Sequence, residues 1–176
     1  MIMRGIRGRV LQILEPGIVT MPDPNGHLSL KEDGYEVMLG NVPDGVIAFK
    51  ADALDNQGFV SPGDSGGIRY RKRADYVLLD FYYRRITVIE LKSRKPNPQD
   101  VVQQLKGARA VASYLAGLAE SFHGEVFGFG DFDWRYVVFA KGSGRKETSR
   151  SNQAPDTALY RYRKQGAVVP YSSLAP

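Results

Sequence analysis

The chain has 176 residues and no cysteine, so disulfide bonds and thiolate metal sites are excluded. Hydrophobic residues make up 43% and charged residues 24%, which is the composition of a globular protein with one hydrophobic core. No run of about 18 apolar residues occurs, so a membrane-spanning helix is excluded. The first residues, MIMRGIRGRV, carry charge without an apolar segment, and we therefore expect no signal peptide and a cytoplasmic protein.

The net charge is +5, and positive charge gathers in one segment. Residues 69–95 contain nine basic side chains and three acidic ones, so any carboxylate there lies among cations. A polyanion such as nucleic acid fits that arrangement. A charged hairpin surrounded by solvent, with no such partner, is the alternative interpretation.

The first fifty residues are predicted to form a β-rich part without a strong helix. Their apolar and β-branched runs are short and are separated by turn formers such as Glu15-Pro16-Gly17 and the proline-rich loop at 22–26. The strands expected there cover residues 10–14, 18–20, 35–39 and 46–50.

Residues 51–57, ADALDNQ, are predicted to form one helical turn or a loop. Asp52 and Asp55 are interpreted as solvated loop charges. The alternative is that they are additional acids close to a functional site.

The segment 63–67 reads GDSGG, which resembles the nucleophile loop of trypsin-like serine proteases. A catalytic triad needs a base within hydrogen-bond reach of the serine and a third group that orients the base. Only His27 precedes Ser65, and the other histidine, His123, follows it. We therefore interpret the segment as a loop built from turn-forming residues.

Two apolar runs at 76–79 and 86–89 are predicted to form an antiparallel hairpin. If its centre lies between Tyr82 and Tyr83, opposed residue numbers add up to 165. Tyr-Tyr is not a favoured two-residue turn, so a four-residue loop over 81–84 with the same centre is the more plausible connection. A register slip of one residue would move Asp75 to the other face of the sheet.

In this register Asp75 lies directly across from Glu90, with Cβ atoms about 4.5–5.5 Å apart. Two carboxylates that close repel one another unless a cation lies between them, and Mg²⁺ prefers oxygen ligands of this kind. Lys92 shares the face of Glu90 because side chains alternate along a strand. It can therefore orient or polarise a water on the metal.

The pattern D-(x14)-E-x-K over residues 75–92, followed by a helix that carries Gln104, resembles the PD-(D/E)XK nuclease superfamily. The resemblance covers about residues 70–118 and implies a restriction-endonuclease-like core. It implies that Asp75, Glu90 and the Leu91 carbonyl hold Mg²⁺, for which Mn²⁺ can substitute. Lys92 would position the attacking water and Gln104, or its neighbour Gln103, would assist; a helix-surface glutamine without a role is the alternative.

Members of this superfamily often carry one more acidic residue, supplied by a helix that begins the core. Glu32 and Glu36 are the best candidates for that acid here, although ordinary surface charge is the simpler interpretation of both. The predicted nucleic-acid contacts are basic residues around the hairpin and the helix, namely Arg71, Lys72, Arg73, Arg94, Lys95 and Lys106.

The segment from Pro98 to Phe122 is predicted to form an amphipathic helix of about twenty residues, because apolar side chains recur at three- and four-residue steps. Gly107 and Gly117 either weaken this helix or permit close packing. The run 134–140 is predicted to be a central strand beside the E-x-K strand, joined to it by a right-handed parallel crossover.

The polar segment 141–157 is predicted to be a flexible basic loop, either a phosphate-binding loop or a plain disordered one. Its basic residues are Lys141, Arg145, Lys146 and Arg150. A short strand pair at 159–163 and 167–169 is expected to close the sheet edge.

These observations predict one α/β domain over residues 1–176, with a mixed central β-sheet flanked by helices. A β-rich part would cover 1–60, a catalytic core 70–140 and the basic loop 141–157. The expected function is Mg²⁺-dependent hydrolysis of nucleic acid, with DNA as the substrate. A non-catalytic nucleic-acid-binding or assembly module on the same fold is the alternative, and a homodimer and a partner protein stay open.

Overall fold

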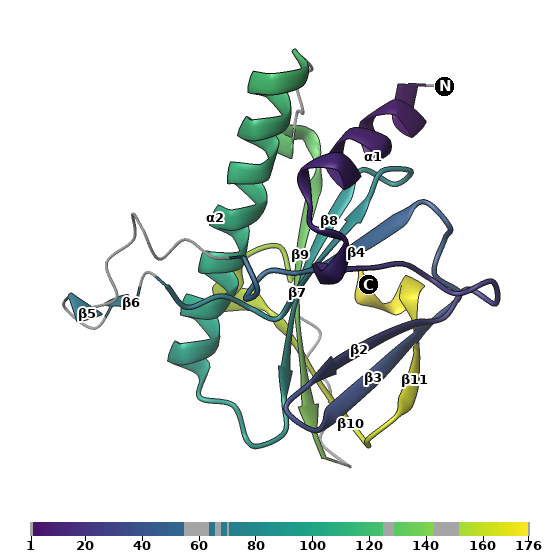
Figure 1. The fold of residues 1–176 in the computed structure, drawn as a ribbon. Coiled ribbons are helices and arrows are strands. Elements are labelled where there is room, and N and C mark those ends of the chain that lie inside the picture. The colour runs from purple at the N-terminus through teal and green to yellow at the C-terminus, as the bar shows by residue number, and fades with distance from the viewer. Residues whose placement is uncertain are drawn as a thin grey trace.

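The computed structural model describes residues 2–54, 64–65, 68–69, 71–124, 129–142 and 152–175. Over these residues the chain forms three layers, with two α-helices, a six-stranded mixed sheet and a three-stranded sheet (Figure 1). The six-stranded sheet lies in the middle, so its strands are covered on both faces. The prediction of an α/β protein with a mixed central sheet and helices is confirmed at this level.

The central sheet has the strand order β1-β4-β7-β8-β9-β10. Neighbouring strands from β1 to β8 are antiparallel, whereas β8, β9 and β10 are parallel. Its strands are β1 (Val19–Thr20), β4 (Val46–Lys50), β7 (Tyr76–Asp80), β8 (Arg85–Lys92), β9 (Asp133–Lys141) and β10 (Leu159–Arg163).

The second sheet has the order β11-β3-β2 and packs on one face of the first. Its strands are β2 (Leu28–Glu32), β3 (Tyr35–Gly40) and β11 (Ala167–Pro170). The remaining short elements are β5 (Asp64–Ser65), β6 (Ile68–Arg69) and the 3₁₀ turns η1 (Pro16–Ile18), η2 (Phe129–Asp131), η3 (Pro155–Thr157) and η4 (Tyr171–Leu174).

Alternation along the central strands divides the interior into two apolar clusters. Val77 on β7 and Val88 on β8 point toward the helices and pack with Leu105. Leu78 and Ile89 point the other way and pack against the second sheet. Burial on both faces explains why these strands are nearly continuous apolar runs in the sequence.

The long helix α2 (Pro98–His123) confirms the predicted amphipathic helix. It begins at Pro98 because Asn97 is its N-cap and accepts a hydrogen bond from the Gln99 N–H at 3.0 Å. It ends where Gly124 adopts a left-handed conformation, with φ of 63°. Its apolar face covers β7 and β8.

Gly107 lets α2 lie directly against the segment that leads into β7. A Cβ atom at this position would come within 1.8 Å of the Lys72 carbonyl oxygen. The Ala74 N–H donates to the Gln104 carbonyl at 2.8 Å in the same contact. Close packing, one of the two roles foreseen for Gly107, is thus what the structure has, although the neighbour is a loop rather than the sheet.

The prediction of a strand at 10–14 was wrong, because these residues belong to helix α1 (Ile2–Ile13) and its end. Val10 and Leu14 lie one helical turn apart and are both buried beside α2, which gives the apolar run a helical role. Residues 51–54 form a turn rather than a helix. The rest of 51–57, most of GDSGG and Arg145, Lys146 and Arg150 lie outside the described residues.

The remaining strand predictions are largely confirmed. β3 and β4 match the expected segments, and β9 runs parallel to β8 as its direct neighbour. β10 closes one edge of the central sheet, but it pairs with β9, whereas β11 pairs with β3 in the other sheet. The expected pairing of these last two strands with each other was therefore wrong. Neither α-helix is both long and apolar enough to cross a membrane within the described part of the chain.

Candidate functional site

The hairpin of β7 and β8 has the register predicted from its sequence. Tyr76 pairs with Ile89 and Asp80 pairs with Arg85, so opposed residue numbers add up to 165. The four residues 81–84 form the connecting turn. This register places Asp75 and Glu90 at the open end of the hairpin on the face that carries α2.

Asp75 is a buried carboxylate with a fixed orientation. Its side chain is 6% exposed, and Oδ2 accepts a hydrogen bond from the Leu91 N–H at 2.6 Å. Burial, followed by the nearby negative charge of Glu90, raises the pKa of Asp75 to about 8. A group in this state takes up either a proton or a cation near neutral pH.

Glu90 is completely buried beside Asp75. The Lys92 ammonium forms an ion pair with Oε1 of Glu90, whereas Oε2 accepts no hydrogen bond from the described residues. Burial raises the pKa of Glu90 to about 7, and Lys92 partly offsets that effect. An unsatisfied carboxylate oxygen in the interior is costly unless a further partner binds it.

Glu32 and Asp52 join Asp75 at the same place. One carboxylate oxygen from each of the three residues lies within 4.8 Å of the others. Glu32 ends β2, and Asp52 follows β4, so three separate segments contribute. Asp52 is an exposed turn residue, as interpreted, and Glu32 is half-buried, but both lie beside Asp75, which favours the alternative of additional acids near the site. Glu36 contacts Ser29 and Lys31 instead.

The hairpin of β2 and β3 is held in place by side chains of the central sheet. The Tyr76 hydroxyl donates to the Lys31 carbonyl at 2.9 Å and accepts from the Lys31 N–H at 3.1 Å. Lys50 Nζ lies 2.9 Å from Oε2 of Glu32. These contacts position Glu32 beside Asp75, so a residue from the outer sheet becomes part of the central cluster.

A sequence signal for this hairpin exists but was missed. Asp33 and Gly34 both have positive φ, at 43° and 74°, as the two central residues of a tight hairpin turn. The dipeptide Asp-Gly between alternating apolar residues is a strong local hairpin signal. The contact of Glu32 with Asp75, in contrast, has no local signal, because it depends on how two sheets pack.

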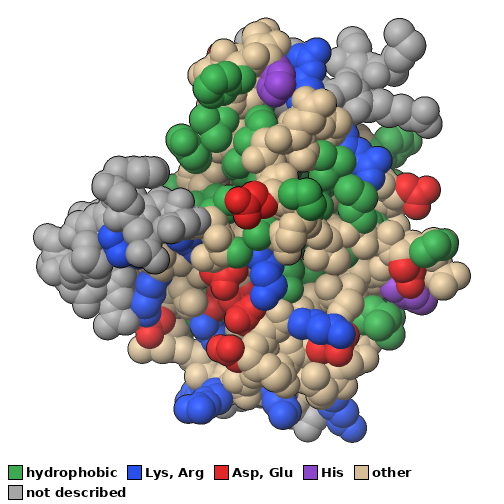
Figure 2. All heavy atoms as spheres, viewed as in Figure 1, with side chains coloured by type: hydrophobic (Ala, Val, Ile, Leu, Met, Phe, Trp, Pro, Cys, Tyr) green, Lys and Arg blue, Asp and Glu red, His purple; other side chains and the backbone are tan. Residues whose placement is uncertain are grey.

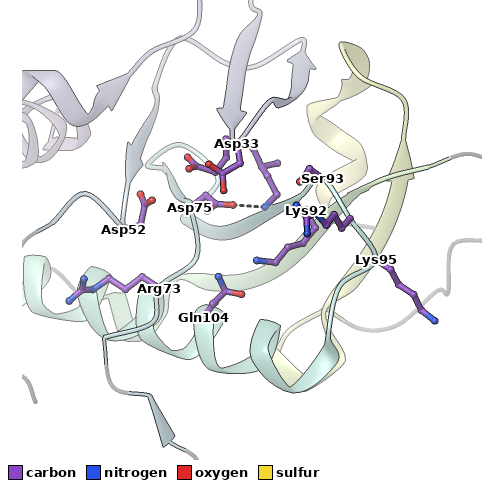
Figure 3. A pocket seen from close by; sticks show the side chains of 11 residues that line it. Asp33, Asp52, Arg73, Asp75, Lys92, Ser93, Lys95 and Gln104 are labelled. Carbon is purple, nitrogen blue, oxygen red and sulfur yellow. Dashed lines mark hydrogen bonds between the residues drawn. The ribbon is translucent and has the colours of Figure 1, made fainter. Parts of the chain in front are cut away.

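The acidic residues line one side of a cavity of about 550 Å³ (Figure 3). Gln104 reaches it from α2, and Leu91 lies on its wall, as expected for both. Gln103 does not line it. Figure 2 shows acidic side chains gathered near the middle of the viewed face with basic side chains beside them. The lining residues are Glu32, Asp33, Asp52, Arg73, Asp75, Leu91, Lys92, Ser93, Arg94, Lys95 and Gln104.

The predicted nucleic-acid contacts divide into two groups. Arg73, Arg94 and Lys95 line the cavity together with the acids. Arg71, Lys72 and Lys106 do not. Lys72 Nζ instead lies 2.7 Å from Oδ1 of Asp100 and ties the segment before β7 to the start of α2. Lys106 is exposed on α2, away from the cavity lining.

The donor set fits a hard divalent cation. Carboxylate oxygens are the ligands that Mg²⁺ and Ca²⁺ prefer, and the cluster offers one or more from each of Glu32, Asp52 and Asp75. Glu90, a predicted metal ligand, is buried and belongs neither to this group of three nor to the cavity lining. The unsatisfied Oε2 of Glu90 and the raised pKa values of Asp75 and Glu90 show that negative charge here lacks sufficient compensation. A bound cation would supply that compensation.

Comparisons with protein-family models, curated proteins and solved structures give no significant match for this chain. The chemistry of the site is therefore inferred from its own residues.

Proposed function

We propose that the protein is a divalent-metal-dependent nuclease that hydrolyses phosphodiester bonds of nucleic acid, with DNA as the substrate. The observation that carries this proposal is the pair of buried carboxylates, Asp75 and Glu90, at the open end of one hairpin with Lys92 on the same face. Both have raised pKa values beside a cavity that basic side chains also line.

The order of elements supports membership of the PD-(D/E)XK nuclease superfamily with a restriction-endonuclease-like core. The antiparallel hairpin β7–β8 is followed by α2 and then by β9, which returns parallel to β8. Helix α1 contains no acidic residue. In this chain the additional acid would come from Glu32 on β2, with Asp52 after β4 as a further one.

Asp75, Glu32 and Asp52 would hold the metal, and Glu90 and the Leu91 carbonyl would complete its surroundings. Bound Mg²⁺ would neutralise charge on the phosphate group and lower the pKa of water beside it. The protein side chains have separate tasks. Glu90 holds the Lys92 ammonium at the cavity wall, where this cation can donate a hydrogen bond to the attacking water or to a phosphate oxygen.

Gln104 would orient the substrate from the opposite wall of the cavity. Its backbone carbonyl is already fixed by the Ala74 N–H, one residue before Asp75. Its amide group can donate to a phosphate oxygen and accept from water. Helix α2 would thus place a neutral hydrogen-bonding group opposite the charged strand residues (Figure 3).

The test is cleavage of supercoiled, linear and single-stranded DNA, and of RNA, with Mg²⁺ or Mn²⁺. Wild type, Lys92→Ala and the control Lys31→Ala are compared, because Lys31 is an exposed lysine outside this cavity. Metal-dependent cleavage that Lys92→Ala loses and Lys31→Ala keeps supports the nuclease. Metal-independent binding of nucleic acid without cleavage by any of them would instead identify a non-catalytic binding module.

A further inference from the structure

The three parallel strands of the central sheet, β8, β9 and β10, have their carboxyl ends on the same side of the sheet, called here the C-terminal end of the sheet. In the parallel register Lys92 on β8 pairs with Ala140 on β9, and Lys141 pairs with Arg163 on β10. Parallel neighbouring strands run in the same direction, so their carboxyl ends lie next to one another. The cavity lies at this C-terminal end as well, because Leu91 and Lys92 at the end of β8 line it.

At this C-terminal end of the sheet, the described residues that end or follow the strands include basic side chains and no acidic one. The described residues that end or follow the three strands are 91–97, 140–142 and 162–166, and none of them is Asp or Glu. Four of their basic side chains are exposed and have no ion pair within the described part of the chain, namely Arg94, Lys95, Lys141 and Lys164. Arg163 adds a half-buried cation beside Lys141.

The opposite end of these strands is different, because its arginines are paired with aspartates. Arg84 pairs with Asp131 at 3.1 Å, and Arg85 and Arg135 both approach Asp133. Among the described residues at the two ends of these strands, the basic side chains without an ion pair therefore lie at the C-terminal end, where the cavity is. Figure 2 shows Lys and Arg side chains along the lower margin of the viewed face, the end at which β9 and β10 finish in Figure 1.

We propose that Arg94, Lys95, Lys141, Arg163 and Lys164 form a phosphate-binding track that carries nucleic acid from the ends of β9 and β10 into the acidic cavity. The proposal rests on the proposed function and identifies the path of its substrate. From β8 to β10 the track spans two strand spacings, about 10 Å. That length corresponds to about three base-pair steps along the axis of a duplex.

Positive charge at this place would offset the electrostatic repulsion between the acidic cavity and the phosphates of a nucleic acid. The carboxylates on one side of the cavity repel a polyanion, so affinity for the substrate has to come from neighbouring cations. Exposed lysines without acidic partners retain their full charge for phosphates, whereas Lys72 and Arg84 are already paired with aspartates. The track thus supplies binding energy outside the reacting centre.

The test measures how binding depends on salt. Fluorescence anisotropy with labelled duplex and single-stranded oligonucleotides is recorded over a KCl series with Mg²⁺, in the Lys92→Ala background so that the probe stays intact. Lys141→Gln/Lys164→Gln is compared with the charge-matched control Arg84→Gln/Arg109→Gln, whose residues lie off the track. Circular dichroism establishes that each variant is folded.

The track variant should lower affinity at low salt by about tenfold or more and make the plot of log K against log salt shallower by about 1.8 for duplex or 1.4 for single strands. The control should keep the parental slope. Equal losses in both double variants, an unchanged slope in the track variant, or binding of anionic lipid vesicles in place of oligonucleotides would each overturn the track.

The proposed function and the track fail separately. If the wild-type protein cleaves nucleic acid but the track variant binds like its parent, the proposed nuclease function is supported and the proposed track is contradicted. If no cleavage occurs but the slope changes as expected, the track stands on a non-catalytic binding protein. If no oligonucleotide binds even at low salt, the track is overturned.

Discussion

A buried aspartate lies at each end of β7 in the β7–β8 hairpin, Asp75 directly before the strand and Asp80 as its last residue, and their surroundings differ. At the turn, Asp80 accepts hydrogen bonds from the Tyr82 and Tyr83 N–H groups and from the Tyr171 hydroxyl, at 3.0, 3.0 and 2.7 Å. At the open end, Asp75 accepts the Leu91 N–H and otherwise faces other carboxylates. Asp80 is thus fully hydrogen-bonded, whereas Asp75 carries negative charge that a bound cation would compensate.

Under the proposed function, this difference separates a structural carboxylate from a catalytic one. A buried charge that is fully hydrogen-bonded fixes the backbone around it, and here Asp80 closes the turn and attaches η4 to the sheet. A buried charge among like charges destabilises the fold, and such strain concentrates at functional sites. Exchanging or removing charge at either end should therefore have opposite consequences for stability and activity.

The largest expected effect is on cleavage. If the proposed function holds, Asp75→Asn should reduce kcat/KM by about 10³-fold, because it would remove a proposed metal ligand while keeping the shape of the side chain. Steady-state cleavage with saturating Mg²⁺ measures this effect. The matched change at the other end, Asp80→Asn, should leave cleavage per folded molecule unchanged, and equal losses in both variants would remove the distinction between the two ends.

Stability should respond in the reverse way. Asp80→Ala leaves the Tyr171 hydroxyl and two backbone N–H groups without their acceptor, which should lower the free energy of unfolding by about 3 kcal/mol. Asp75→Asn should leave the metal-free protein as stable as wild type or more stable. Urea unfolding in EDTA gives both values, and a loss of stability in Asp75→Asn as large as that in Asp80→Ala would contradict the comparison.

The pH dependence of stability should identify the open end. Because the pKa values of Asp75 and Glu90 are raised to about 8 and about 7, the folded protein keeps protons that the unfolded chain has released. Stability from this pair is therefore present near pH 4 and is lost as pH rises toward 8. The loss should be on the order of 2 to 3 kcal/mol, or about 5–10 °C in Tm.

The control for this pH effect is Asp75→Asn/Glu90→Gln, which cannot ionise at either position. Thermal unfolding in EDTA at about pH 5 and pH 8 should show a smaller decrease of Tm in this variant than in wild type. The same decrease in both proteins would mean that the pair does not hold protons in the folded state.

Two glycines of α2 allow the docking of the helix at the open end to be tested separately from helix propensity. Gly107→Ala should cost about 2 kcal/mol, because its methyl group would overlap the Lys72 carbonyl and push Gln104 away from the cavity. Gly117→Ala meets no atom within 4 Å and should stabilise the helix by about 0.5–1 kcal/mol. Chemical unfolding measures both, and a stabilising Gly107→Ala would show that α2 does not dock there.

The smallest expected effects concern the support of the metal site. Glu32→Gln and Lys50→Met should each weaken Mg²⁺ or Mn²⁺ binding by about tenfold, since one removes a proposed ligand and the other removes the lysine paired with it. Isothermal titration calorimetry gives the affinities. Asp33→Asn is the control, because Asp33 lines the cavity outside the group of three acids. Equal weakening by Asp33→Asn would indicate general electrostatics rather than ligation.

The hairpin, its register and α2 could be predicted because their signals are local. Apolar alternation and a centre at Tyr82–Tyr83 are enough to place Asp75 opposite Glu90, and Asn97-Pro98 with Gly124 marks both ends of the helix. Helix α1 was missed because the run 10–14 is equally apolar for a strand, and its packing on α2 decides between the two.

The rest of the site depends on contacts between distant segments. Nothing near Glu32 or Asp52 in the sequence indicates that they meet Asp75, since their positions depend on the packing of the outer sheet and on the turn after β4. The same holds for the ion pair of Lys72 with Asp100, which joins residues 28 positions apart. A short motif gives the chemistry of a site, whereas its full composition requires the fold.

The Tyr76 hydroxyl also has a kinetic consequence. It joins two segments 45 residues apart through both backbone groups of Lys31. Closing a loop of this length has an entropic cost, which the β4–β7 and β7–β8 pairings can offset once they have formed. Glu32 is therefore expected to reach the cavity late during folding and to leave it early during partial opening, so that the cavity matures last and is lost first while the central sheet persists.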